Sequence, residues 1–150
     1  QLNYLLNDKL NQKLPPFINL GKLGLNFGLQ GMQFTATSTV AENQTLSFPM
    51  YVHSIPNNND NQDIVSMGCN AALMTRKVID NGFDVLAIQT MALAQAIDHL
   101  KCQPRLSSFA HNFYEQLRGM VGPIVNDEPR YKDIQSVRKY LVTLGSSIKL

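Results

Sequence analysis

A polar stretch rich in side-chain amides, residues 54–63, carries the side chains best suited to hold a small polar ligand. We expect Asp60 or Asn61 to cap a helix, because their side-chain oxygens can accept hydrogen bonds from the free N–H groups at a helix start. Gln62 then falls in the first turn, where backbone N–H groups and the helix dipole create a positive potential. Such a place suits a substrate carboxylate or a developing negative charge. The competing interpretation is that the Asn run after Pro56 is only a favourable chain reversal.

A long helix is expected to position this loop. From Gln62 to Lys101 charges are few, and apolar or small residues recur on two adjacent lines that together make a broad apolar stripe. Taken alone, Asn81-Gly82 predicts a turn that would split the stretch into two packed helices. We favour one continuous helix of about 40 residues, roughly 60 Å long at ~1.5 Å per residue. One line contains Ile64, Met67, Ala71, Met74, Val78, Val85, Ile88 and Ala92, and the other Val65, Ala72, Ile79, Leu86, Leu93 and Leu100.

The remaining periodic segments also predict helices. Residues 1–10 read as a short helix, and 108–120 and 133–144 as amphipathic ones, the first of these capped by the serines at 107 and 108. Residues 29–48 are ambiguous, because 34–40 is β-branched and would pass for a strand, but the apolar spacing favours a helix. The glycines at 21, 24 and 28 mark turns and match no common phosphate-binding spacing. We therefore expect an all-α fold built as a bundle around the long helix.

Composition limits the class of protein. The chain has 150 residues, is 44% hydrophobic and carries a net charge of +2 with scattered Lys and Arg, so we expect one domain with a true core and no nucleic-acid or membrane-surface patch. Residues 1–11 lack the features of a signal peptide, and no apolar run approaches the ~20 residues needed to cross a bilayer. We expect a soluble, cytoplasmic protein. Because position 1 is Gln, we also expect an excised or truncated piece of a longer chain.

The cysteines and histidines predict no metal site. Cys69 and Cys102 lie ~50 Å apart along a straight helix, too far for a disulfide, and are expected to be free and buried. His53, His99 and His111 lack metal-ligand spacing. His99 falls on the apolar stripe and is expected in the core, whereas His53 lies beside the polar loop. No combination of serine, histidine and carboxylate indicates a nucleophilic centre.

Several motifs together resemble the aromatic amino acid ammonia-lyases and aminomutases, the family of histidine, phenylalanine and tyrosine ammonia-lyases. The likeness covers nearly all of the chain, in family order. Its strongest part is Ser54-Ile55-Pro56 followed by Asn61 to Gly68. The others are Leu14 to Phe17, Gly24 to Gly28, Ala41 to Asn43, Val85 to Gln89 with Ala94 to Asp98, and Asp127 to Ile134.

The resemblance implies an all-α homotetramer whose long helices pack in a central bundle, with three subunits contributing to each active site. It supports continuity of the long helix through Gly82. Family chemistry uses the electrophile 4-methylidene-imidazol-5-one (MIO), made from an internal Ala-Ser-Gly, and a catalytic tyrosine upstream of the matched region. This sequence contains no Ala-Ser-Gly. We therefore expect residues 1–150 to be the C-terminal portion of such an enzyme, without catalytic residues of its own, without a metal, and inactive alone.

Residue by residue, the resemblance places four positions at the substrate and cofactor. Asn61 and Gln62 match the amide pair beside both, and Asn58 and Gln30 match variable positions that line the site. Histidine-specific members carry Glu where Gln62 stands, and a carboxylate can pair with an imidazole as a neutral amide cannot. The amide therefore favours L-tyrosine or L-phenylalanine over L-histidine.

The reaction implied is elimination of ammonia to give an α,β-unsaturated acid. An aminomutase, which returns the ammonia to the β-carbon, is an open alternative. A non-catalytic helical module that serves only oligomerisation is another.

Overall fold

The computed structural model describes residues 1–11, 13–62 and 64–147, and it is all-α as expected. Three 3₁₀ turns, at Pro16–Ile18, Met50–Val52 and Gln103–Arg105, connect the helices. The helices are α1 (Leu2–Leu6), α2 (Asp8–Asn11), α3 (Gln30–Leu46), α4 (Gly68–Leu100), α5 (Ser108–Met120) and α6 (Tyr131–Ser147).

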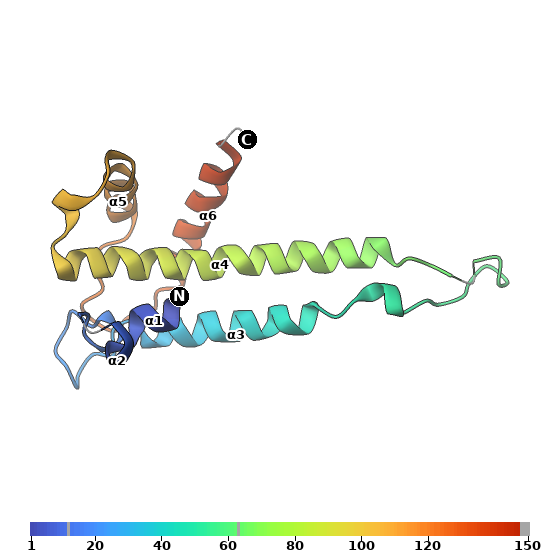
Figure 1. The fold of residues 1–150 in the computed structure, drawn as a ribbon, viewed down its shortest axis with the longest axis horizontal. Helices are drawn as coiled ribbons and strands as arrows, with labels where there is room; N and C mark the ends of the chain where they lie inside the picture. Colours follow the sequence, from blue (N-terminus) through green and yellow to red (C-terminus); the bar gives the residue numbers. More distant parts are fainter. Residues whose placement is uncertain (12, 63, 148–150) are drawn as a thin grey trace.

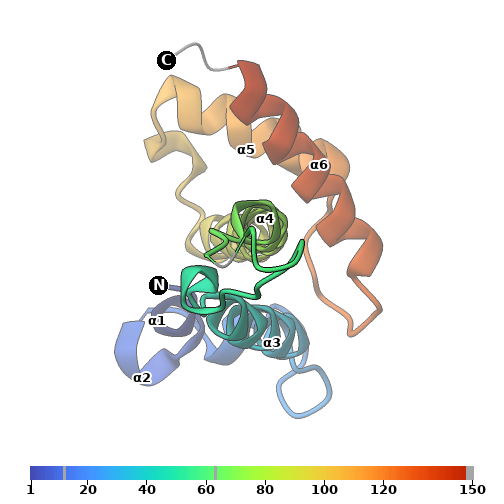
Figure 2. The ribbon, with the colours of Figure 1, turned by 90° about the vertical axis from the view of Figure 1, so that its right-hand side faces the viewer.

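The molecule is organised around α4. In Figures 1 and 2, α3 runs along one side of α4 while α5 and α6 lie on the other, and α1 and α2 sit beside the start of α3. The second half of α3 and the first half of α4 extend beyond the other helices and form a long arm (Figure 1). The arm ends in the loop between Val52 and Gly68.

A single core lies where α4 meets the other helices. Its largest fully buried apolar side chains are Leu6, Ile18, Leu29, Ile88, Met91, Leu117 and Val137. Gln95 on α4 is completely buried among them, and it is fully hydrogen-bonded. Its Nε2 donates to the carbonyls of Ile18 (3.2 Å) and Ile124 (2.7 Å), and its Oε1 accepts from Ile124 N–H (2.9 Å). One side chain thus joins α4 to two crossing loops.

The long helix is continuous through Asn81-Gly82, as predicted. Asn81 is buried, and its side-chain amide donates to Glu42 Oε2 (2.6 Å) and Asn43 Oδ1 (2.8 Å) on α3. A residue that favours turns when exposed therefore serves here as a polar contact between two helices. Arg138 of α6 pairs with Asp80 (2.7 Å) and Asp84 (3.2 Å) on the same part of α4.

The predicted start of the long helix was wrong. The helix begins at Gly68 and has 33 residues, fewer than the predicted 40, because Met67 adopts a left-handed conformation (φ 50°). Gln62 uses its backbone N–H and C=O to pair with Asn57, so it cannot belong to the first helical turn. The helix ends at Leu100 and is followed by Lys101, whose left-handed φ of 49° closes it.

Most other predicted helices are confirmed. The ambiguous segment 29–48 is α3, and α5 is capped by Ser107, whose hydroxyl accepts from Ala110 N–H (3.3 Å). The last helix is longer than predicted at both ends and includes Gly145. Residues 1–10 form two short helices instead of one, because Asn7 is extended.

The cysteine prediction is confirmed only in part, and the prediction that His99 lies in the core was wrong. Cys69 and Cys102 are free and lie at opposite ends of α4, but Cys69 is exposed and Cys102 half-buried, so neither is the buried thiol that was predicted. His99 is exposed near the end of α4. In the described parts of the chain no helix is long and apolar enough to cross a membrane.

Candidate functional site

The amide-rich loop is a tight turn at the far end of the arm (Figure 1). Asn57 N–H donates to Gln62 C=O (3.1 Å), and Gln62 N–H donates to Asn57 C=O (3.3 Å), closing the turn. Asn58, Asn59 and Asp60 between them all adopt left-handed φ angles, of 54°, 52° and 59°. Asn and Asp tolerate this region better than other non-glycine residues, which explains the composition of the run.

The side chains of the loop face solvent. Asn58, Asn61 and Gln62 are all exposed. Gln62 lies six residues before Gly68, so the dipole of α4 does not act on it as predicted. The part of the sequence argument that still applies is chemical, because the neutral side-chain amide of Gln62 can donate and accept hydrogen bonds.

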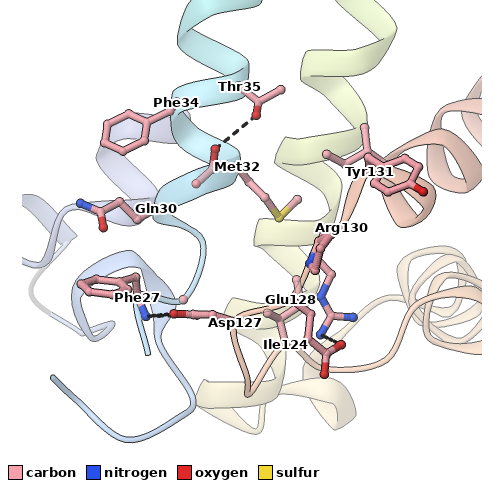
Figure 3. Close-up of a pocket in the computed structure, with 14 residues that line it drawn as sticks. Phe27, Gln30, Met32, Phe34, Thr35, Ile124, Asp127, Glu128, Arg130 and Tyr131 are labelled. Atoms are coloured by element: carbon pink, nitrogen blue, oxygen red, sulfur yellow. Dashed lines mark hydrogen bonds and ion pairs between the residues drawn. The ribbon is translucent and has the colours of Figure 1, made fainter. Parts of the chain in front are cut away.

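The fourth predicted site residue, Gln30, lies in a different place. It is the first residue of α3 and lines a groove of about 550 Å³ between the start of α3 and the segment that leads into α6. In Figure 3 Gln30 and Phe34, one helical turn apart, project from the same side of α3. The groove is large enough for a single aromatic amino acid.

Aromatic rings that the sequence argument did not select also line this groove. Phe27, Phe34 and Tyr131 are 61%, 65% and 58% exposed, so their faces are available to a ligand or to another chain. Phe34 could have been found from its position four residues after Gln30, which places both on one helix face. Tyr131 could not, because its approach to α3 depends on how the last loop folds back.

The charges beside the groove compensate one another. Arg130 pairs with Glu128 (3.4 Å) and Asp133 (3.2 Å). Asp127 accepts Phe27 N–H with both carboxylate oxygens, at 3.1 and 2.9 Å. Arg130 is the one cation among the described residues that line the groove, and because two acids share it, none of these residues offers a free cation to a substrate carboxylate.

One chain does not bring the four predicted residues together. Gln30 is at the start of α3, whereas Asn58, Asn61 and Gln62 lie beyond its end (Figure 1). The 17 residues of α3 alone span roughly 25 Å at ~1.5 Å per residue. Within one chain, the groove and the loop are thus separated by the length of α3.

Within the described residues no group of three or more His, Cys, Asp or Glu side chains could hold a metal ion. The residues present also do not fit the role of MIO precursor. The sequence has no Ala-Ser-Gly, the tripeptide from which the family resemblance implies that this group is made.

Comparison with known proteins gives the relationship of the chain. A family model described as aromatic amino acid lyase matches residues 1–119. The MIO-dependent tyrosine 2,3-aminomutase of Streptomyces globisporus is 40% identical over 137 residues, which cover 91% of this chain and 25% of the relative. The histidine ammonia-lyase of Staphylococcus saprophyticus is 39% identical over 145 residues, 97% of this chain and 29% of the relative.

Two further matches agree. The tyrosine ammonia-lyase of Cupriavidus metallidurans is 35% identical over 157 residues, 100% of this chain and 30% of the relative. The crystal structure of tyrosine aminomutase from Streptomyces globisporus matches with a TM-score of 0.89 at 36% identity, covering 99% of this chain and 30% of that one. The chain therefore spans about a quarter to a third of the length of these relatives, and it belongs to the aromatic amino acid lyase family.

Proposed function

We propose that this chain is the C-terminal portion of an enzyme that eliminates ammonia from L-tyrosine or L-phenylalanine to give an α,β-unsaturated acid. The observation that carries the reaction class is 35–40% identity, across nearly the whole chain, to two ammonia-lyases and an aminomutase. Those relatives act on tyrosine or histidine according to their names, so identity alone does not choose the substrate.

The choice of substrate rests on Gln62. Its neutral amide can exchange hydrogen bonds with a phenol, a carboxylate or an amino group, but it cannot form an ion pair with an imidazolium. Hydrogen bonds to charged partners contribute about 1.5–3 kcal/mol, whereas neutral ones contribute ~1 kcal/mol. An amide at this position therefore gives histidine no advantage over tyrosine or phenylalanine. In the proposed enzyme Gln62 and Asn61 orient the substrate.

In the proposed enzyme the groove and the loop are two half-sites, and each is completed by another copy of the chain. When two arms pack antiparallel, the loop at the tip of one lies near the base of the other, which is where the groove of Gln30 lies. Parallel packing would bring two loops together and leave both grooves without one. The proposed active site therefore combines Gln30 and its aromatic neighbours from one copy with Asn58, Asn61 and Gln62 from another.

An exposed apolar line on α4 supports self-association. Ile79, Leu86, Leu93 and Leu100 follow one another at seven-residue spacing and are 55%, 50%, 47% and 46% exposed. This spacing is typical of a seam between packed helices. The proposed partner is the same line on a second copy of the chain, within a homotetramer.

The test is a product assay on the complete gene product, with residues 1–150 alone as a control. L-tyrosine, L-phenylalanine and L-histidine are incubated separately and the ultraviolet absorbance of the unsaturated acid is followed. Coumarate or cinnamate without urocanate is the expected result, and the isolated chain is expected to be inactive. Urocanate as the main product would overturn the substrate proposal. Turnover by the isolated chain would show that it contains catalytic residues not identified in its structure.

A second candidate is an aromatic 2,3-aminomutase, favoured by the 40% identity to the tyrosine 2,3-aminomutase. It is distinguished by chromatography of the same reactions, because a β-amino acid lacks the extended absorbance of the unsaturated acid. A third is a helical module used only for assembly, favoured by the exposed apolar line on α4. Association of the isolated chain together with inactivity of the complete gene product toward all three amino acids would support it.

A further inference from the structure

We infer that Asp127 is a positioning residue of the proposed active site, which fixes the start of α3 and through it the side chain of Gln30. This inference rests on the proposed function, because it concerns the groove that would receive the substrate. It is carried by a hydrogen-bond path that connects residues 100 positions apart in the sequence.

The path passes through one residue, Phe27. Both carboxylate oxygens of Asp127 accept Phe27 N–H, at 3.1 and 2.9 Å, as Figure 3 shows for one of them. The carbonyl of Phe27 then accepts Gln30 N–H (3.3 Å) at the first turn of α3. Asp127 therefore fixes the N–H of Phe27, and the carbonyl of the same residue accepts the backbone N–H of Gln30.

A second hydrogen bond between the same two segments runs in the opposite direction, with Asp127 as the donor. Asp127 N–H donates to Asn26 Oδ1 (3.3 Å), and Asn26 C=O accepts from the side chain of the buried Asn19 (2.6 Å). The backbone between Asn26 and Gln30 also passes close to its neighbours. A Cβ on Gly28 would lie 2.8 Å from the carbonyl oxygen of Phe17. Small displacements of this segment are thus resisted on both sides.

Among the described residues, the first turn of α3 offers no acidic or capping side chain of its own, and the backbone N–H of Leu29 donates to the carbonyl of Phe17 (3.0 Å). The N-cap position of this helix is Leu29, which makes no side-chain cap hydrogen bond, and its first turn has no acidic residue. The carboxylate of Asp127 accepts its hydrogen bonds from the N–H of Phe27, three residues before α3, so it orders the segment that enters the helix. Here the carboxylate comes from the distant loop that also forms one wall of the groove.

The neighbouring acid does a different job. Glu128 contacts the side chain of Arg130 (3.4 Å), whereas the carboxylate of Asp127 contacts the backbone N–H of Phe27. Charge near the groove is therefore common to both acids, but the bond to Phe27 belongs to Asp127. Asp127 is also exposed, so replacing it removes little packing and is compatible with a folded chain.

The experiment is a double-mutant cycle in the complete enzyme. Asp127→Ala, Gln30→Ala and the double variant are compared with Asp127→Asn, which keeps one acceptor oxygen, and with Glu115→Gln, which removes an exposed acid on α5. Asp127→Ala is expected to raise KM for the amino acid about fivefold or more with kcat changed less. The reason is that the substitution displaces the groove that binds the amino acid and leaves the reacting groups in place. Asp127→Asn should restore most of the loss and Glu115→Gln should behave as wild type.

The cycle separates positioning from general stability. If Asp127 acts through Gln30, then Asp127→Ala changes KM less than about twofold once Gln30 is already Ala. An equal effect in both backgrounds, or an unchanged KM in the single variant, would overturn the inference.

Hydrogen exchange decides the case if the wild-type enzyme turns over none of the three amino acids, which is the failure of the proposed function. The amides of residues 27–30 are expected to exchange at least about tenfold faster in Asp127→Ala than in Glu115→Gln. Equal exchange rates would show that Asp127 does not hold this segment, whatever the enzyme does.

Discussion

Single residues carry the proposed specificity, and Gln62 is the most direct to test. Gln62→Glu in the complete enzyme is expected to lower kcat/KM for L-tyrosine about tenfold, equivalent to ~1.4 kcal/mol, because a carboxylate cannot donate to the substrate. The same change should raise the relative rate with L-histidine, since a carboxylate can pair with an imidazolium. Steady-state formation of coumarate and urocanate measures both.

The matched control is Asn59→Asp, which makes the same amide-to-acid change three residues away in the same exposed turn. It should leave the ratio of the two products unchanged. Equal effects of the two substitutions would mean that the loop responds to charge in general, and the role assigned to Gln62 would then be wrong.

Asn81 shows how a residue can mislead when its surroundings are unknown. Its dipeptide with Gly82 indicates a turn in isolation, but a buried amide that donates to Glu42 (2.6 Å) and Asn43 (2.8 Å) indicates a contact between helices. The sequence alone could favour a continuous helix from periodicity. It could not identify the partners, because these lie nearly 40 residues away on α3.

Asn81→Asp should therefore destabilise the chain by about 2–3 kcal/mol. The carboxylate keeps the shape of the amide but loses both donated hydrogen bonds and faces Glu42. Asn70→Asp, at an exposed position in the first turn of α4, makes the same change where an acid is tolerated or favourable. Urea denaturation at one fixed protein concentration compares them, and equal losses of stability would contradict this account of Asn81.

At the level of elements, the helices were predictable and their ends were not. Ile64 fits the apolar line of the long helix, yet it is 85% exposed and lies outside α4. The helix start is set instead by the backbone pairing of Asn57 with Gln62 and by the left-handed Met67. Hydrophobic periodicity cannot report either feature, because it describes side chains and not backbone hydrogen bonds.

Continuity of α4 gives a prediction about Gly82. An added Cβ there meets nothing within 4 Å, so Gly82→Ala should stabilise the chain by about 0.5–1 kcal/mol through helix propensity. Gly28→Ala is the contrasting variant, because Gly28 has φ +58° and its Cβ would lie 2.8 Å from Phe17 O. It should destabilise by ~2 kcal/mol or more. Denaturant midpoints test both, and a loss of stability in Gly82→Ala would indicate a kink or a helix contact at this position.

For the whole molecule, the sequence indicated the family and the fold class but not where the candidate site residues lie. Gln30, Asn58, Asn61 and Gln62 were selected together by resemblance, and only the structure separates them by the length of the arm. Distance across a fold is not encoded in local spacing. Because these residues are far apart within one chain, the proposed site can form only in an assembly of several chains.

Assembly is tested on the apolar line of α4. Residues 1–150 are expected to self-associate, because Leu86 and Leu93 lie half-exposed at the middle of that line. The double substitution Leu86→Glu and Leu93→Glu places charges on the seam of both partners and should shift the mass measured by light scattering to that of the monomer, with helical circular dichroism retained. His99→Glu, which adds a charge one residue, or ~100°, round the helix from Leu100, should not. A wild-type chain that is already monomeric would contradict the seam itself, whereas dissociation by His99→Glu as well would show that charge on α4, rather than loss of this line, breaks the assembly.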